Sequence, residues 1–205
     1  MLKIYLARHG QNVDNVNGVL NGHRDKPLTK KGIEQAHEVA NKIKGNNLHF
    51  DFIYTSPLKR ASKTAEIISD TINGSKPVEM IELIERDFGV MTGEKQSRIE
   101  ELCAPDIIKA ELITYFLNPK GAETFPDLVK RADELLLKVK NKHKDGNILL
   151  VTHGDFGKMI YAAYYNLHWK EVLELFHFGN SELLLLSPNS QAGEAHVFKI
   201  LQHNH

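Results

Sequence analysis

The sequence predicts an α/β protein: a three-layer α/β/α sandwich with a mainly parallel sheet and a small helical cap insertion. Three observations support this class. Strand and helix signals alternate along the whole 205-residue chain, which is typical of layered α/β folds. Two short apolar runs, residues 2–7 and 148–151, are each followed closely by a His-Gly pair. No repeat, linker or low-complexity tract divides the chain, so we expect one domain over residues 1–205.

The first strand is expected over residues 2–7. A Gly- and Asn-rich segment follows over residues 10–22. Thr29 is then placed to accept a free backbone N–H at the start of a helix that Gly45 ends. Apolar side chains recur at helical spacing within it and predict one buried face: Ile33, Ala36, Val39, Ala40 and Ile43.

The second strand and the helix after it carry the first candidate arginine. Residues 52–54 form a short apolar run. Ser56 and Pro57 then provide an N-cap and a first-turn proline, and Gly74 ends the helical pattern. Arg60 is therefore expected in the first turn of this helix.

The middle of the chain is expected to contain one more strand and an inserted lobe. Residues 78–81 have the composition of a third strand, and Glu85 follows them. Residues 97–117 are broken by Pro105 and predict short helices. We therefore expect a cap insertion over about residues 93–125, called the cap segment below.

The last third of the chain returns to long, regular elements. A helix follows Pro126 with apolar residues at helical spacing, and Gly146 precedes the strand that ends at Thr152. The remaining expected elements are helices over residues 155–165 and 170–176 and strands over residues 183–186 and 197–201.

Composition restricts the partners and the location of the protein. The chain has 26 basic and 26 acidic side chains, so no net field favours nucleic acid or an anionic membrane. No run of about 18 apolar residues occurs, and the N-terminus lacks the pattern of a signal peptide. A single cysteine, Cys103, cannot form an intrachain disulfide and suits a reducing compartment. We expect a soluble cytoplasmic protein.

Three motifs share one position in the predicted fold. Arg8-His9-Gly10, the turn from Ser56 to Arg60 and Thr152-His153-Gly154 all follow a strand. Ligands of open α/β sheets bind outside the carboxyl ends of the strands. Arginine supplies planar paired donors for phosphate, and helix N-termini add backbone N–H groups. Two arginines and two histidines at this edge predict a phosphate pocket that needs no metal.

The same residues predict covalent chemistry. Positive neighbours disfavour imidazolium, so a histidine between arginines keeps a nucleophilic nitrogen near pH 7. Glu85 is the best candidate for moving the proton of the leaving group. Each feature alone has an ordinary explanation, Arg60 as a solvated arginine, Glu85 as a surface carboxylate and His153 as a packed strand-end residue. Their coincidence favours an active site.

No metal or cofactor site is expected. The chain has 11 histidines, but no His-x-x-x-His or clustered Cys/His spacing typical of zinc sites. The proposed pocket is also already cationic.

With these motifs in order, the chain resembles the histidine phosphatase superfamily, in its phosphoglycerate-mutase-like branch. The resemblance covers nearly the whole chain. The matching positions are Leu6-Ala7-Arg8-His9-Gly10-Gln11, Asn15, Asn21-Gly22, Asp25 with Pro27-Leu28-Thr29, Gly32 with Gln35-Ala36, Phe52, Ser56-Pro57-Leu58-Lys59-Arg60-Ala61, Thr64-Ala65, Glu85 with Phe88-Gly89, Gly93, Gly121-Ala122-Glu123, Arg131 and Val151-Thr152-His153-Gly154.

The resemblance implies a role for each site residue. His9 would be the phosphorylated nucleophile and Glu85 the proton donor, while Arg8, Arg60 and His153 would form the phosphate pocket. It also implies substrate contacts by Asn15, Asn21, Gly22 and the Gly154 backbone. The chain departs from the family's usual pattern at two places that affect these finer contacts. Asn12 stands where a small hydroxyl residue is common, and the sequence Gly121-Ala122-Glu123-Thr124 lacks the serine that usually follows Gly-Glu.

The cap segment favours hydrolysis over transfer. Phosphoglycerate mutases resemble the chain at Glu85-Arg86, but they generally carry a longer insertion with an adjacent arginine pair. Between residues 93 and 121 this chain has one arginine, Arg98. A shorter, less basic cap would protect a phosphorylated intermediate from water poorly. We expect a phosphatase, with a cofactor-dependent phosphoglycerate mutase or a catalytically silent phospho-ligand-binding module as alternatives.

The expected substrate is a small phosphorylated metabolite, phosphoserine ahead of 3-phosphoglycerate. Lys95, Arg98 and Lys109 are candidates for binding a substrate carboxylate, although cap lysines are usually solvated. Pairing between the edge strands of two copies would form a homodimer, and the sequence leaves this oligomeric state open. The polar tail, residues 202–205, ends in a histidine that could close over the cleft.

Overall fold

The computed structural model describes residues 1–189 and 196–198. Its central sheet has six strands in the order β3-β2-β6-β1-β7-β8. The first four of these are parallel to one another, and β7 and β8 are antiparallel to their neighbours. The strands are β1 (Leu2–Arg8), β2 (Phe52–Thr55), β3 (Val78–Glu79), β6 (Gly146–Thr152), β7 (Leu183–Leu186) and β8 (His196–Phe198). The predicted mainly parallel sheet is confirmed.

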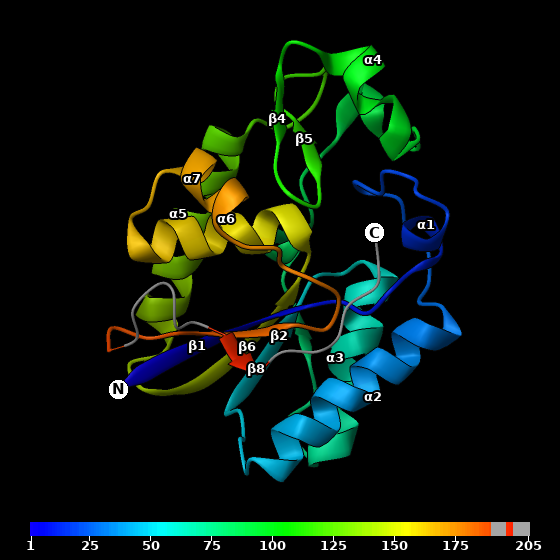
Figure 1. Ribbon diagram of the computed structural model, residues 1–205. Coiled ribbons are helices and arrows are strands. Elements are labelled where there is room, and N and C mark those ends of the chain that lie inside the picture. The colour runs from blue at the N-terminus through cyan, green and yellow to red at the C-terminus, as the bar shows by residue number, and fades with distance from the viewer. Residues whose placement is uncertain (190–195, 199–205) are drawn as a thin grey trace.

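Helices cover both faces of this sheet (Figure 1). One face carries α2 (Lys30–Gly45) and α3 (Lys59–Ile72), and the other carries α5 (Phe125–Lys142), α6 (Gly154–Tyr165) and α7 (Trp169–Leu175). The two core clusters use alternate residues of the same strands: Leu6 and Leu150 pack on the α5–α6 side, and Ala7 and Val151 on the α2–α3 side. Burial on both faces explains why these strands are continuously apolar.

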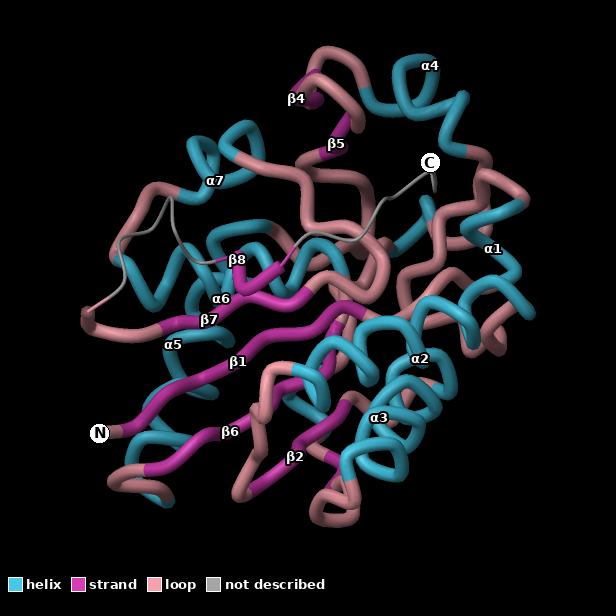
Figure 2. The backbone as a smooth tube through the Cα atoms, turned by 60° about the horizontal axis from the view of Figure 1, so that its bottom comes forward, coloured by secondary structure: helices cyan, strands magenta, loops and turns pink. Residues whose placement is uncertain are grey.

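Strand pairing decides where the site forms. In the register of β1 and β6, Arg8 lies opposite Thr152. His9 and His153 follow these residues directly, so the two histidines leave the sheet side by side. Figure 2 shows β1 and β6 running together, with β2 on the far side of β6.

One of the two predicted helix N-caps is confirmed, and the other was wrong. Thr29 Oγ1 accepts the Gly32 N–H at 3.0 Å as the N-cap of α2. Ser56 is not the N-cap of α3, which begins at Lys59. The Lys59 N–H instead donates to Asp25 Oδ1 at 2.7 Å. Ser56 is thereby left to contact the site, as described below.

Short elements connect the sheet to the cap segment. The strand predicted over residues 78–81 is only Val78–Glu79 and is followed by η1 (Ile81–Leu83). Ile33, expected on the inner face of its helix, is 38% exposed. The other short elements are α1 (Val13–Val16), η2 (Gly89–Met91), η3 (Gln96–Arg98) and α4 (Ile99–Cys103).

The cap segment is only partly helical. The prediction of short helices is confirmed for η3 and α4 but was wrong for β4 (Ile107–Lys109) and β5 (Thr114–Phe116), which pair as antiparallel strands. β-Branched and aromatic side chains in both strands favour extended backbone. Figure 1 shows this hairpin beside α4, beyond the layer of α5, α6 and α7.

No helix among the described residues is long and apolar enough to cross a membrane. The strand predicted over residues 197–201 is described only as β8, and the tail over residues 202–205 lies outside the described residues.

Candidate active site

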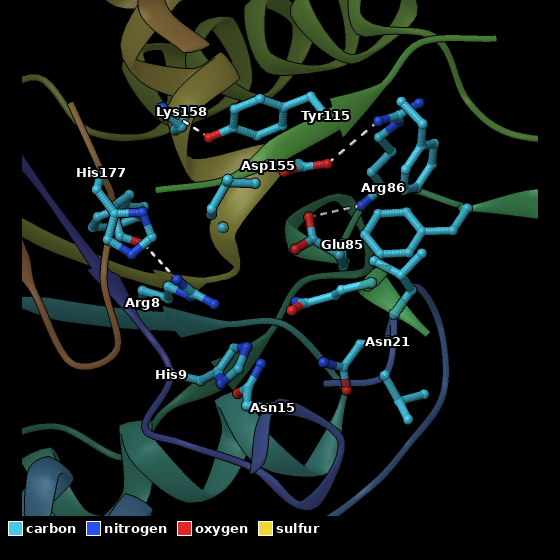
Figure 3. Close-up of a pocket in the computed structure, with 18 of the residues that line it drawn as sticks. Arg8, His9, Asn15, Asn21, Glu85, Arg86, Tyr115, Asp155, Lys158 and His177 are labelled. Atoms are coloured by element: carbon cyan, nitrogen blue, oxygen red, sulfur yellow. Dashed lines mark hydrogen bonds and ion pairs between the residues drawn. The ribbon is translucent and has the colours of Figure 1, made fainter. Parts of the chain in front are cut away.

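A pocket lies at the carboxyl ends of β1 and β6 and extends to the cap segment. Figure 3 shows two sides, with His9, Asn15 and Asn21 on one and Tyr115 and Lys158 on the other. The residues that line it are Arg8, His9, Asn15, Val19, Leu20, Asn21, Arg60, Glu85, Arg86, Phe88, Gln96, Ile113, Thr114, Tyr115, Phe116, Gly154, Asp155, Lys158, His177 and Phe178.

The two histidines predicted to face each other do so. Their ring centroids are 5.1 Å apart with an interplanar angle of 61°. Arg60 connects them, because its Nε lies 3.2 Å from His9 Nε2 and 3.2 Å from His153 Nδ1. The other guanidinium nitrogens of Arg60 donate to the carbonyls of Arg24 at 2.6 Å and Gly22 at 2.9 Å. Arg60 is thus fixed by the loop over residues 21–24.

The hydrogen bonds determine which ring nitrogens carry protons. His9 Nδ1 lies 2.7 Å from the Gly10 carbonyl, which can only accept, so Nδ1 carries the proton. His9 Nε2 then has a lone pair, which faces the Arg60 N–H. By the same reasoning His153 accepts at Nδ1 and donates from Nε2 to Ser56 Oγ at 2.8 Å. Both rings are neutral, and His9 presents a nucleophilic nitrogen.

Burial is the main reason that these rings are neutral. Burial lowers the pKa of His9 and of His153 well below the ordinary histidine value, and the Arg60 and Arg8 charges lower both further. Arginine charge was the cause anticipated from the sequence, and it ranks second here. Burial also lowers the pKa of Arg60, to about 10, which leaves the guanidinium charged at neutral pH.

One donor of Arg8 has no partner among the residues that the structure describes. Its Nη1 donates to the Phe178 carbonyl at 2.6 Å. Its Nε is buried and has no hydrogen-bond partner among the described residues. A buried, unsatisfied charged donor is costly. An oxyanion bound in the pocket would satisfy it.

Gly10 and Gly154 bring backbone close to the site. A Cβ atom on Gly10 would lie 2.3 Å from the Gly32 carbonyl oxygen of α2, so only glycine fits there. A Cβ atom on Gly154 would lie 3.5 Å from Arg8 Cζ. Glycine after His9 is therefore required by close packing, whereas a side chain after His153 would contact the Arg8 guanidinium.

Glu85 is held at the N-terminus of α6. Its Oε1 accepts the backbone N–H of Arg86 at 2.9 Å and of Phe156 at 3.1 Å. Figure 3 shows the carboxyl group between the two sides of the pocket. It is 6% exposed, so it is a buried pocket residue rather than a surface carboxylate. This position suits a group that exchanges a proton with a bound ligand.

Some of the residues expected to contact substrate line the pocket, and others lie behind its lining. Asn15, Asn21 and Gly154 line the pocket. Gly22 does not, but its carbonyl holds Arg60. His153 is also behind the wall and contacts Arg60 instead.

Asn12, the departure at the small hydroxyl position, has a structural explanation. It forms a reciprocal capping box with Asn15 at the start of α1. Its Nδ2 also donates to Asn21 Oδ1 at 2.6 Å. Asn12 therefore orients two residues that line the pocket.

Four charged or hydrogen-bonding residues stand out among the pocket residues that were not identified as site residues from the sequence. Arg86 is fully buried, stacks on Phe116 and Phe125, and donates to the Leu117 and Glu123 carbonyls at 3.1 and 2.7 Å. The others are Tyr115, Asp155 and Lys158. Asp155 and Lys158 share the inward side of α6, and Asp155 follows the His-Gly motif directly, which was the one available signal. Tyr115 comes from the unpredicted hairpin.

The cap cations considered for a substrate carboxylate do not line the pocket. Lys95 donates to the Asn17 carbonyl. Arg98 pairs with Glu94 and Glu101, and Lys109 pairs with Glu100. That interpretation of the three residues finds no support in their positions.

The described residues contain no group of three or more His, Cys, Asp or Glu side chains that could hold a metal ion. The charges nearest His9 are arginines.

The chain is similar to enzymes of two kinds. It is 31% identical over 180 residues, covering 84% of both chains, to a 2,3-bisphosphoglycerate-dependent phosphoglycerate mutase of Parvibaculum lavamentivorans. Among solved structures it is similar to the Entamoeba histolytica phosphoserine phosphatase in complex with 3-phosphoglyceric acid (29% identity, TM-score 0.70) and, as a mutant, with phosphoserine (26% identity, TM-score 0.72). Each covers 90% of both chains. Residues 4–200 match the family model of the histidine phosphatase superfamily (branch 1), and the chain belongs to this superfamily.

Proposed function

We propose that the chain is a metal-independent phosphatase that hydrolyses a small phosphomonoester through a phosphohistidine. The observation that carries this proposal is that one pocket is lined by both His9, whose Nε2 has a lone pair, and Arg8, whose Nε is a buried donor without a described partner. A phosphoryl group bound there would satisfy the Arg8 donor and bring phosphorus to the His9 lone pair.

The proposed reaction has two displacements. His9 Nε2 attacks phosphorus, and the bond from phosphorus to the ester oxygen breaks as Glu85 gives that oxygen a proton. Water then attacks the phosphohistidine, Glu85 takes a proton from it, and the bond to Nε2 breaks to release phosphate. Arg8 and Arg60 stabilise the charge that develops on the phosphoryl oxygens, and His153 contributes to this by holding Arg60 in place. Asn15, Asn21 and the Gly154 backbone are the proposed substrate contacts.

Two observations favour hydrolysis over transfer. The cap cations are paired with acidic residues or a backbone carbonyl outside the pocket, and Arg86 donates to cap carbonyls. A second phosphate on the substrate would find few uncommitted donors beyond Arg8 and Arg60. Phosphoserine is our leading substrate, supported by similarity to the Entamoeba enzyme.

A phosphoglycerate mutase is the second candidate, because the curated relatives have that name at 27–31% identity. It would require a bisphosphorylated primer and would form the isomer before free phosphate. Product analysis with 3-phosphoglycerate and that primer distinguishes the two.

We further propose one domain with the cap segment as an insertion, and a cytoplasmic location. The free thiol of Cys103 supports this location. The balanced charge supports a small metabolite, rather than nucleic acid or a membrane, as the partner.

The central experiment is a screen of phosphorylated metabolites for phosphate release, with His9→Ala in parallel. We expect a burst of labelled wild-type enzyme, no labelled variant, and turnover lower by roughly 10³-fold or more in the variant. Equal turnover by both proteins would contradict the proposed nucleophile.

A further inference from the structure

One carboxylate in the pocket has no part in the proposed phosphoryl chemistry. Asp155 is the second residue of α6, and its side chain is 16% exposed. Figure 3 shows it on the wall with Tyr115 and Lys158, across the pocket from His9. His9 and Arg8 fix the place of the phosphoryl group. Asp155 therefore faces the part of a ligand that is not phosphate.

Asp155 retains acceptor capacity toward the pocket. Its Oδ2 accepts a hydrogen bond from Arg86 Nη1 at the long distance of 3.4 Å, and no described residue donates to its Oδ1. A carboxylate has about four acceptor sites. The shorter bonds of Arg86 go to the Glu123 and Leu117 carbonyls. Arg86 alone therefore leaves the carboxylate under-satisfied.

The neighbouring Lys158 does not supply the missing donor to Asp155. Lys158 Nζ donates to the Tyr115 hydroxyl at 3.1 Å and to the Leu173 carbonyl at 2.8 Å, and it forms no described hydrogen bond with Asp155. Burial and the Glu85 charge raise the pKa of Asp155 to about 6, although Arg86 and Lys158 act in the opposite direction. A cation placed in the pocket beside Asp155 would stabilise its ionised form.

We infer that Asp155 is a specificity-determining residue that binds a primary ammonium group on the substrate, so that the preferred ligands are phosphomonoesters of amino alcohols or amino acids. The inference rests on the proposed function for its ligand class. The Asp155 and Glu85 carboxylates would also repel a second anionic group at this position.

Binding tests this without turnover. In a His9→Ala background, calorimetry compares phosphoethanolamine with propyl phosphate, which has a methyl group in place of the ammonium. Adding Asp155→Asn should weaken phosphoethanolamine binding about 10- to 100-fold more than propyl phosphate binding, the effect of one charge-assisted hydrogen bond. Asp127→Asn is the matched control, an acid in the first turn of α5 outside the pocket. It should change neither affinity.

An equal loss for both esters, or no loss, would overturn the inference. Propyl phosphate binding in the same samples shows that the Asp155→Asn protein is folded.

If the Asp155→Asn protein does not fold, the inference is tested by the pH dependence of ester binding to the His9→Ala protein. The charged and titratable groups that face Asp155 are Glu85, Arg86, Lys158, Arg8 and Tyr115. The affinity ratio of the two esters, in which phosphate titration cancels, should fall below pH 6 as Asp155 is protonated. A ratio constant from pH 7.5 to 5 would overturn the inference.

Phosphate release from both esters by the wild-type protein is recorded separately. No release from these or any other phosphomonoester contradicts the proposed function, while the affinity ratio still decides the role of Asp155.

Discussion

The rings of His9 and His153 lie with their centroids 5.1 Å apart, and one N–H of Arg60 is 3.2 Å from a nitrogen of each. The parallel pairing of β1 with β6 produces this contact between residues 144 positions apart in the sequence. This single shared donor orients both rings, while burial keeps them neutral. The lone pair of His9 Nε2 is therefore fixed in direction before any ligand binds.

Replacing Arg60 tests this arrangement. Lysine keeps the charge but cannot contact both histidines and the Arg24 and Gly22 carbonyls together. We expect Arg60→Lys to lower kcat/KM for phosphate release by about 10²- to 10³-fold. Lys63→Met, on the exposed side of the same helix, is the control. Activity of Arg60→Lys within threefold of wild type would contradict the shared-donor arrangement.

The buried histidines should make the fold sensitive to acid. Their pKa values are well below 6.5 in the folded protein, so below pH 6.5 the unfolded chain binds more protons and stability falls as pH falls. Between pH 6.5 and 5.5, protonation of these two rings in the unfolded chain should lower the free energy of unfolding by about 2 kcal/mol. Urea unfolding at both pH values measures the difference.

The variant His9→Gln removes one of the two titrating rings. The fall in its free energy of unfolding over the same pH interval should therefore be smaller than that of wild type by about 1 kcal/mol, the contribution of one ring. An unchanged pH dependence would show that burial does not suppress protonation of His9.

Arg86 should stabilise the cap segment. Its guanidinium donates to the carbonyls of Leu117 and Glu123 and stacks on Phe116 and Phe125. Arg86→Met leaves those acceptors and Asp155 without a donor, and we expect a loss of about 3–5 kcal/mol in the free energy of unfolding. Arg98→Met, which removes only exposed ion pairs, should have little effect. If Arg86→Met and Arg98→Met had the same free energy of unfolding, the prediction that Arg86 stabilises the cap segment would be wrong.

Chelators should not change turnover. The described residues offer no three-ligand metal cluster, and Arg8 and Arg60 supply positive charge at the proposed phosphoryl site. Phosphate release is measured after dialysis against EDTA, with a metal-dependent phosphatase as the positive control. Activity that disappears with the chelator and returns with a divalent ion would refute the metal-free mechanism.

Local patterns predicted the parts of the site that follow strands. Alternating apolar strands and helices, with Thr29 as an N-cap, predicted the layers and their order, because propensity, capping and apolar periodicity are local properties. His9, Arg60 and His153 could be placed at one edge because ligands of open parallel sheets bind there. Ser56 shows the limit of this reasoning. Serine is a common N-cap residue, but the Ser56 hydroxyl instead contacts His153, which follows the neighbouring strand β6.

The sequence by itself determined the fold class and the superfamily, and it predicted the residues that we propose bind the phosphoryl group. Only the tertiary structure decided which ring nitrogen of His9 has the lone pair, that the charged side chains of Lys95, Arg98 and Lys109 lie outside the pocket, and that Asp155 lines it. Tautomers, burial and unpaired donors depend on contacts between residues far apart in the chain, such as Tyr115 with Lys158. Such contacts exist only after the sheet, helices and hairpin have packed together.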